Sequence, residues 1–361
     1  MSQINYYATN QPVEAEASHL LESETQSPDL SSKIANDLSY GELLRKLTYT
    51  IIDIIRKPRY FLVFAFARFR TVRYIYSFFA ELLIGSKTTA TTGDDSTSLF
   101  SQADTINIVK TLKQDGVFLG FSLPQNFLSQ LMQSLNNRDC YAGGRPDIGF
   151  RIAHKAQIDK VFPQPFYVAR YFNISHDCPQ IVQLVNDPKL REIATKYIGK
   201  QAKYTGSSLF WTFPVEGESS DWEQQKFRYY HYDIDDVSGV RFCFYLTDVT
   251  LDNGPHVCIK GSHIKKSLSH VLNYLSRIQP ETELAKVYDP EQFVTITGSS
   301  GYGFIEDTFC FHKGAPPQNQ PRLFLQLHFA VHNYNQEQSY LDVRDPKTLR
   351  SYPLFQETYV Q

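Results

Sequence analysis

Apolar and polar residues alternate in many stretches of the chain after residue 203, and this alternation predicts short strands. It is clearest in 322–332, where every second residue is apolar and most of the residues between are polar. A period of two places the apolar side chains on one face of a strand. These positions are Leu323, Leu325, Leu327, Phe329 and Val331. The other predicted strands are 203–213, 227–234, 239–247, 256–260, 293–297, 302–306 and 309–311.

Helical patterns precede these strands and interrupt them once. Apolar residues recur at helical spacing, and two of the predicted helices carry further signals: 124–135 opens on proline, and 186–198 has Asn or Asp at its beginning and glycine at its end. A run of short strands with helices around it predicts a mainly β fold with flanking helices, and its core is expected to be a double-stranded β-helix of the jelly-roll, cupin-like type. The predicted helices are 106–112, 124–135 and 186–198, with a helical insertion in 264–288.

Changes in composition along the chain predict its division into segments. Residues 1–38 are rich in Ser, Glu, Gln and Asn, with few large apolar residues, so they are expected to form a disordered tail. Thr, Ser, Gly and Asp dominate 87–101, which is typical of a linker. The strand-rich domain is expected at 102–335, and a C-terminal tail at 336–361.

The segment 39–86 differs from both of its neighbours, because it is helical in pattern, aromatic and basic. It holds eight basic and three acidic residues, a net charge of +5 in a chain whose total is −2, so the remainder carries −7. Its uninterrupted apolar runs are shorter than the eighteen or so residues that a membrane-spanning helix needs. The segment is therefore expected to lie in a membrane interface as a peripheral contact, to dock on the strand-rich domain, or to hold a partner.

Overall composition restricts the protein class. A 42% hydrophobic content can fill a sizeable core, and a net charge of −2 gives no basic field that would attract nucleic acid. The number of cysteines is odd, they show no CxxC spacing, and no signal peptide pattern precedes them. We therefore expect a protein of the reducing cytoplasm that does not bind nucleic acid, with an association with membranes left open. The cysteines are Cys140, Cys178, Cys243, Cys258 and Cys310.

His231 and Asp233 form a candidate metal-binding pair. In a strand, residues two apart point to the same side, with Cα atoms about 6.8 Å apart. An imidazole and a carboxylate can close that gap onto one ion at roughly 2.0–2.2 Å. A later histidine, His312, would complete three ligands, and the absence of a fourth clustered ligand disfavours a structural zinc site.

Arg322 follows the distal histidine by ten residues and lies on the polar face of the predicted strand 322–332. It points either into a pocket or into water. Beside a metal site, the planar fork of a guanidinium can hold the far carboxylate of a dicarboxylic acid in a bidentate pair. Lys203 and Arg241 are alternative basic groups for such an acid.

These residues stand in an order that resembles the phytanoyl-CoA dioxygenase family of Fe(II)- and 2-oxoglutarate-dependent oxygenases. The resemblance covers 102–335, and the order and spacing of the motifs are more specific than any one of them. Lys260 stands where family members usually have proline. Phe324 stands where many have serine, so a second hydrogen bond to 2-oxoglutarate either comes from elsewhere or is absent. The motifs are His231-x-Asp233, Leu251-Asp-Asn253-Gly254-Pro, Lys260-Gly-Ser-His263, Asp307-Thr, Phe309-Cys-Phe-His312-Lys-Gly and Arg322.

The resemblance implies that His231, Asp233 and His312 bind Fe(II) and that Arg322 binds the carboxylate of 2-oxoglutarate. It also implies reaction with O2, release of succinate and CO2, and oxidation of a small-molecule or lipid-like substrate. Related halogenases have a small residue where this chain has Asp233, which favours hydroxylation of a C–H bond. The alternative is a jelly-roll protein that binds a ligand or partner without turnover. The sequence specifies neither the substrate nor the oligomeric state.

Overall fold

The computed structural model describes residues 58–84, 97–161, 166–215, 229–272, 279–334 and 349–352. The chain divides into two units, Met1–Phe61 and Leu62–Gln361, and the second contains all the described strands. The predicted tail 1–38, much of the segment 39–86, most of the linker 87–101 and most of the tail 336–361 lie outside the described residues.

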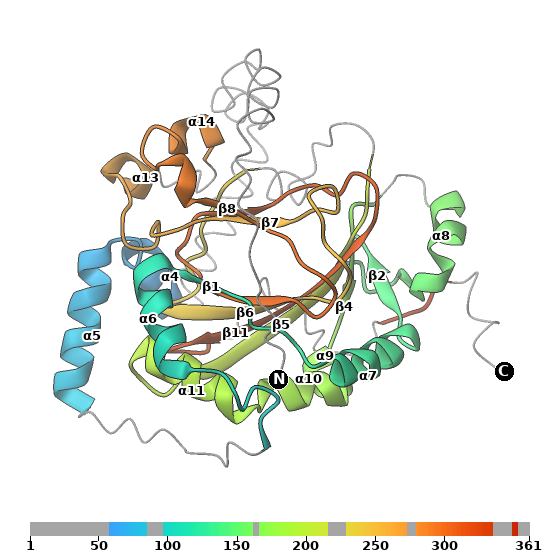
Figure 1. The fold of residues 1–361 in the computed structure, drawn as a ribbon, viewed down its shortest axis with the longest axis horizontal. Helices are drawn as coiled ribbons and strands as arrows, with labels where there is room; N and C mark the ends of the chain where they lie inside the picture. The colour runs from blue at the N-terminus through green and yellow to red at the C-terminus, as the bar shows by residue number, and fades with distance from the viewer. Residues whose placement is uncertain are drawn as a thin grey trace, which may run out of the picture. The chain divides into compact units, whose positions relative to one another are not determined.

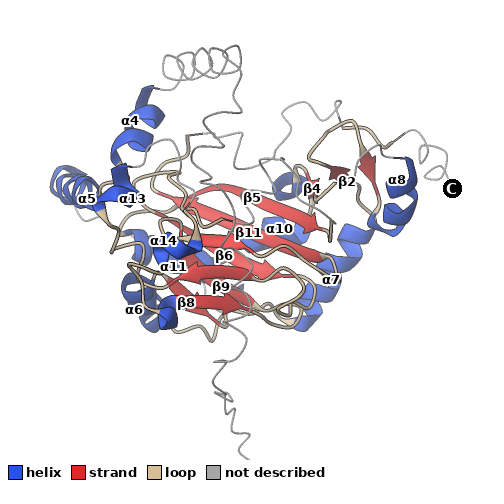
Figure 2. Ribbon diagram, turned by 90° about the horizontal axis from the view of Figure 1, so that it is seen from above, coloured by secondary structure: helices blue, strands red, loops and turns tan. Residues whose placement is uncertain are grey.

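Two antiparallel sheets form the core of the fold, which is a jelly roll as predicted. Figure 2 shows the central strands of the large sheet side by side. The eight-stranded sheet has the order β1 (Val117–Leu119), β9 (Gly303–Asp307), β6 (Gly239–Tyr245), β11 (Arg322–Ala330), β5 (Lys203–Thr212), β4 (Val168–Tyr171), β2 (Cys140–Ala142) and β3 (Gly149–Phe150). The three-stranded sheet has the order β10 (His312–Gly314), β7 (His256–Ile259) and β8 (Phe293–Ile296).

The helices between residues 174 and 198 cover the face of the large sheet that is turned away from the small sheet, whereas those between 268 and 284 lie on the side of the small sheet (Figure 1). The predicted caps explain where one of the helices begins and ends: the Asp187 carboxylate accepts hydrogen bonds from the N–H groups of Lys189 and Leu190 at the start of α11, and Gly199 ends that helix at φ 79°. The helices are α4 (Pro58–Phe66), α5 (Arg70–Ile84), α6 (Thr105–Asp115), α7 (Gln125–Asn136), α8 (Lys155–Val161), α9 (Ile174–Asp177), α10 (Pro179–Val185), α11 (Pro188–Ile198), α13 (Leu268–Leu272) and α14 (Glu281–Leu284).

The alternation along β11 separates two apolar clusters, which confirms the predicted faces of this strand. Leu323, Leu325 and Leu327 belong to the cluster that includes the helices, whereas Phe324 belongs to the cluster between the two sheets. The polar residues Arg322 and His328 share the face of Phe324, so they lie inside the jelly roll rather than in water.

Two of the predicted strands were wrong in detail. Within 227–234 the described residues form isolated bridges at Tyr230 and His231 rather than a continuous strand. The predicted strand 309–311 is a turn, because the Asp307 carboxylate accepts the Phe309 N–H at 2.6 Å, and the strand begins instead at His312 as β10. The predicted insertion in 264–288 contains the short helices α13 and α14.

Two of the segments predicted from composition contain ordered residues. Phe100, in the predicted linker, is buried and stacks on Phe121 with 4.2 Å between ring centroids. In the C-terminal tail, Tyr352 donates its N–H to the Gly149 carbonyl at 2.7 Å. All five cysteines are buried and free of disulfides. Among the described residues, no helix is both long and apolar enough to cross a membrane.

Candidate metal centre

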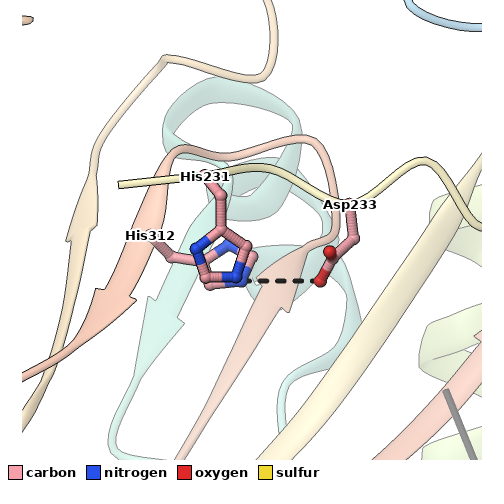
Figure 3. A group of neighbouring side chains, drawn as sticks. All are labelled: His231, Asp233 and His312. Carbon is pink, nitrogen blue, oxygen red and sulfur yellow. Dashed lines mark ion pairs between the residues drawn. The ribbon is translucent and has the colours of Figure 1, made fainter. Parts of the chain in front are cut away.

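Backbone pairing brings His231 and His312 together across 81 positions of sequence. The His231 N–H donates to the His312 carbonyl at 2.9 Å, and the His312 N–H donates to the His231 carbonyl at 2.8 Å. Asp233 follows in an irregular stretch, and its backbone N–H donates to the Thr308 carbonyl at 2.8 Å. Figure 3 shows the three side chains converging on one point, with the two imidazole rings beside each other. The structure therefore unites the three residues that the sequence predicted as ligands.

The geometry of these side chains fits one metal ion. Their ligand atoms lie within 4.8 Å of one another, and His312 Nε2 is 3.6 Å from Asp233 Oδ2. Two ligand atoms at right angles on one ion are about 3 Å apart when each bond is roughly 2.0–2.2 Å long. Small side-chain adjustments would therefore close the group onto a metal.

Hydrogen bonds set the tautomers of both histidines. Nδ1 of His312 is 3.0 Å from the Cys310 carbonyl, and Nδ1 of His231 is 3.2 Å from the Tyr229 carbonyl. A carbonyl oxygen accepts hydrogen bonds, so each Nδ1 carries the proton and each Nε2 holds the lone pair that a metal ion takes. This is the arrangement expected of metal-binding histidines.

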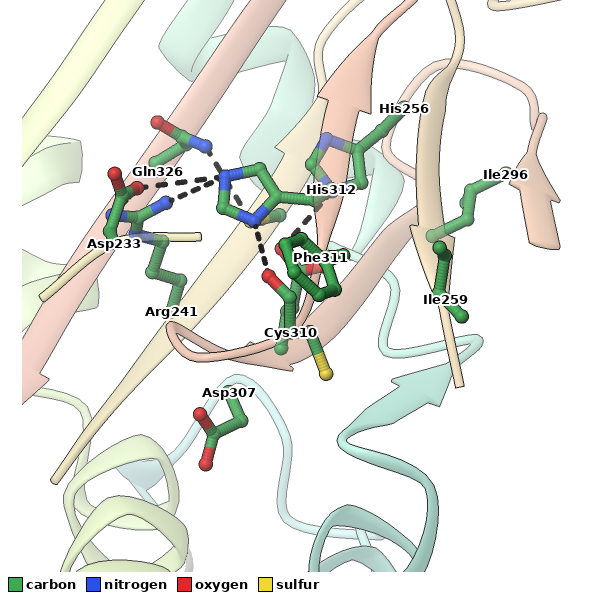
Figure 4. Close-up of polar contacts among 12 residues, drawn as sticks. Asp233, Arg241, His256, Ile259, Ile296, Asp307, Cys310, Phe311, His312 and Gln326 are labelled. Atoms are coloured by element: carbon green, nitrogen blue, oxygen red, sulfur yellow. Dashed lines mark hydrogen bonds and ion pairs between the residues drawn. The ribbon is translucent and has the colours of Figure 1, made fainter. Parts of the chain in front are cut away.

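Arg241, on β6, forms a buried ion-pair network around Asp233. Its Nη2 donates to Oδ2 of Asp233 and, at 3.1 Å, to Oδ2 of Asp235, and its Nε donates to Nδ1 of His328 at 3.1 Å. Its Nη1 lies 3.4 Å from Nε2 of His312 (Figure 4). Burial raises the pKa of Asp233, but interactions led by the nearby charge of Arg241 outweigh burial and hold that pKa well below its ordinary range. The carboxylate is therefore ionised, as a metal ligand must be.

Arg322 is the first residue of β11 and lies inside the jelly roll. The residue is 1% exposed, its Nη1 donates to the Gly254 carbonyl, and its guanidinium carbon is 5.0 Å from the centroid of the Phe324 ring. Its Nε has no hydrogen-bond partner among the described residues. Burial lowers the pKa of Arg322. A surface position is therefore excluded, and the buried side chain retains N–H donor capacity for an anion.

A second buried pair, His256 and Glu306, lies beside the candidate ligands. Nε2 of His256 is 3.0 Å from Oε2 of Glu306, which is fully buried, and the ring of His256 stacks on His312 with centroids 5.4 Å apart (Figure 4). This pair was not identified from the sequence. The available signal was period two in β9, which places Glu306 on the inner face with Phe304.

Three further residues named in the sequence analysis, Asp307, Lys203 and Lys260, lie outside the group of candidate ligands. Asp307 orders the turn before His312, since its carboxylate accepts hydrogen bonds from Phe309 N–H and from the Tyr197 hydroxyl. Lys203, an alternative basic group, is exposed at the start of β5. The Lys260 ammonium is 39% exposed and lies 4.0 Å from the Asp115 carboxylate. Neither lysine contacts the candidate ligands through any interaction found among the described residues.

Comparison with solved structures finds distant matches. AviO1 from Streptomyces viridochromogenes Tue57 is 13% identical, over 63% of this chain and 95% of that chain, with a TM-score of 0.41. EctD from S. alaskensis is 20% identical, over 68% of this chain and 83% of that chain, with a TM-score of 0.41. The epimerase SnoN, in complex with Fe3+, alpha-ketoglutarate and nogalamycin RO, is 11% identical, over 62% of this chain and 82% of that chain, with a TM-score of 0.41. Likeness of this degree specifies no substrate.

Comparison by sequence is more specific. No curated protein matches the chain. A sequence model described as phytanoyl-CoA dioxygenase (PhyH) matches residues 167–320, a range that contains His231, Asp233 and His312 and ends two residues before Arg322. From these three ligand-type side chains, their jelly-roll setting and this match, we conclude that residues 167–320 form a domain of the phytanoyl-CoA dioxygenase family.

Proposed function

We propose that this protein is an Fe(II)- and 2-oxoglutarate-dependent dioxygenase that hydroxylates a C–H bond of a small-molecule or lipid-like substrate. The observation that carries the proposal is the convergence of His231, Asp233 and His312 within 4.8 Å in a domain of this family. In the balanced reaction, one O2 gives one oxygen atom to the substrate and the other to succinate, while 2-oxoglutarate loses CO2.

The three residues have the composition of a facial triad. Two imidazoles and one carboxylate on one side of an ion leave three adjacent positions, as in non-haem iron oxygenases. Bound iron would supply the activation of O2 that is coupled to decarboxylation of 2-oxoglutarate. The protein's own contribution is to fix both histidine tautomers and to hold the carboxylate of Asp233 against Arg241.

Arg322 is proposed to bind the far carboxylate of 2-oxoglutarate. Its burial places the guanidinium in a water-poor interior, where a charge-assisted pair with a carboxylate is stronger than in water. Phe324, in the position where many family members have serine, packs against Phe304 and His256 and offers no hydroxyl. Arg322 would therefore carry a large share of the cosubstrate's binding energy.

Hydroxylation is favoured over halogenation because Asp233 provides a carboxylate at the third ligand position. A halogenase needs space for a halide there, and the carboxylate fills it. The same reasoning makes Asp233→Ala a useful variant, because it empties that position while both histidines remain.

Succinate formation from 2-oxoglutarate tests the proposal. The purified protein with Fe(II) should form succinate under air and, without O2, should show the weak visible charge-transfer band of an iron-chelated 2-oxo acid. His231→Ala and Asp233→Ala should lose the band. If both variants keep the band and the turnover, the assignment of the metal site is wrong. Ligand binding without succinate under any condition would support the non-catalytic alternative.

Arg322→Gln tests cosubstrate binding separately from metal binding. The substitution removes the charge and the bidentate fork, and a contact of this type contributes about 1.5–3 kcal/mol. The variant should keep its affinity for Fe(II) and need roughly tenfold to a hundredfold more 2-oxoglutarate. Lys203→Gln, which removes an exposed cation on β5, is the matched control and should behave as the unmodified protein. An unchanged requirement for 2-oxoglutarate in Arg322→Gln would show that another group binds it.

A further inference from the structure

The helices α4 and α5 carry a cluster of exposed apolar side chains. Elsewhere among the described residues, exposed side chains of this kind are widely separated in sequence, from Ile106 to Val287. In the eighteen positions from 62 to 79 there are six of them, with exposed fractions between 47% and 72%. They are Leu62, Phe66, Tyr74, Ile75, Phe78 and Phe79. Such a concentration of exposed apolar side chains is typical of a surface that binds another protein or a membrane.

Helical geometry places the exposed residues of α5 on one face. Tyr74 and Phe78 are four apart, and so are Ile75 and Phe79, which puts the four side chains in one broad stripe. The rings of Phe78 and Phe79 meet edge to face with centroids 5.7 Å apart. The stripe is therefore an exposed, largely aromatic face of the helix.

The opposite face of α5 is fixed to the jelly-roll domain. The Arg73 guanidinium lies 3.8 Å from the centroid of the Phe309 ring and donates to the carbonyls of Ala67 at 2.9 Å and His263 at 3.0 Å. The Tyr76 hydroxyl lies 2.9 Å from Nε2 of His332. These contacts hold the helix in place, so rotating the exposed stripe onto the core would break them.

We propose that the exposed face of α4 and α5 binds the surface of an anionic lipid bilayer. The segment 39–86 carries a net charge of +5, whereas the rest of the chain carries −7, so an anionic surface attracts this segment and repels the remainder. Aromatic side chains next to basic residues are typical of helices that lie in the membrane interface. The described helices are too short or too polar to span a bilayer, so they lie on it.

Charge argues against a second copy of the chain as the occupant. A twofold dimer places the same surface of each copy against the other, which would bring the exposed Arg59 and Arg70 of one copy near those of the other. Like charges across an interface disfavour association. An anionic bilayer instead complements both the apolar stripe and the charge beside it.

Vesicle flotation of the full chain tests the proposal. Vesicles of phosphatidylcholine with about 30% phosphatidylglycerol should bind the protein at about 0.1 M salt. Vesicles of phosphatidylcholine alone, or salt raised to about 0.5 M, should bind it at least about tenfold less. Failure of the unmodified chain to bind the anionic vesicles at low salt overturns the proposal.

The double variant Phe78→Ser and Phe79→Ser identifies the face. Because both rings are exposed, the substitutions leave the core unchanged and should keep the thermal unfolding midpoint and any succinate formation. Binding to the anionic vesicles should fall by about tenfold or more, since each ring would lose its burial in the interface. Arg70→Glu should weaken binding and reduce its dependence on salt.

The matched control is Ile106→Ser, which removes an exposed apolar side chain, 77% accessible, from α6. It should bind vesicles as the unmodified chain does. If the Phe78 and Phe79 variant binds vesicles normally, the face is not the membrane contact. If that variant instead converts a soluble oligomer to a monomer while vesicle binding is unchanged, the stripe is a protein interface and the proposal is wrong.

Discussion

Replacement of Arg241 by methionine is expected to have opposite effects on stability and on metal affinity. Methionine keeps much of the length of the side chain and removes its charge and its hydrogen bonds. Arg241 is 5% exposed and donates to Asp233, Asp235 and His328. Removing one partner of a buried ion pair costs about 3–5 kcal/mol. The two aspartate side chains are 21% and 20% exposed, so solvent screening reduces the expected loss to about 2–4 kcal/mol.

Metal affinity is governed by two effects of different size. Losing a residue that orients a ligand typically weakens metal binding by about tenfold to a hundredfold, or roughly 1.4–2.8 kcal/mol. Arg241 Nη1 is 3.4 Å from His312 Nε2, so its charge would lie near any bound cation. A unit charge about 5 Å from a divalent ion is repelled by about 6–7 kcal/mol at an effective dielectric constant of about 20. Even if screening halves it, this repulsion exceeds the orienting effect, so Arg241→Met should bind divalent metal more tightly.

Two measurements check this reasoning. Urea unfolding in the presence of a chelator should show the loss of stability, and competition with a metal indicator dye under anaerobic conditions should show tighter binding of Co(II). Arg241→Lys keeps the charge while losing the fork, and it serves as the control: its metal affinity should stay at or below that of the unmodified protein. Equal weakening of metal binding in both variants would show that orientation outweighs charge and would refute the argument.

Two further predictions concern the scaffold. Gly116→Ala should lower the free energy of unfolding, measured by urea titration, by about 2–5 kcal/mol, because Gly116 has φ +76° and a Cβ atom would lie 2.3 Å from the Cys310 sulfur. Gly120 has φ +84° but no atom within 4 Å of an added Cβ, so Gly120→Ala should lower the free energy of unfolding by only about 1–2 kcal/mol. Burial raises the pKa of Glu192, but hydrogen bonds from Lys196 and Lys189 outweigh burial and lower it to about 2, so Glu192→Gln should cost about 1–3 kcal/mol at neutral pH. A carboxyl with a depressed pKa stabilises the fold above its ordinary pKa, so the difference between the two proteins should disappear as the pH falls from about 4.5 to about 2, and a constant difference over that range would contradict the assignment.

The sequence predicted the elements whose signals are local. Alternation in β11 depends on its own residues, and the start and end of α11 depend on Asp187 and Gly199. The grouping of His231, Asp233 and His312 was predicted from the order of the motifs. Motif order indicates which residues meet in the folded protein, but not how the chain brings them together. The structure adds how they meet, through the two backbone hydrogen bonds between His231 and His312.

The environment of the site could not be predicted, because it depends on contacts between distant strands. Every residue of β6 is buried, so this strand shows no alternation that would reveal where Arg241 points. The pairing of His256 with Glu306 joins strands from different sheets, 50 positions apart. The apolar run before His312 has the composition of a strand, and its turn is closed at Asp307, which accepts the Phe309 N–H at its carboxylate and the Cys310 N–H at its backbone carbonyl.

The position of β11 determines when this domain can assemble. It is the last of the described strands along the chain, yet it lies between β6 and β5 in the middle of the large sheet. Until the ribosome has released it, β5 and β6 each lack a neighbour, and such unpaired edges favour aggregation. Pairing of Arg322 with Thr212 spans 110 positions, and contacts of this range slow folding. A nascent chain that already holds all three candidate ligands is therefore still unable to complete the large sheet that they lie against.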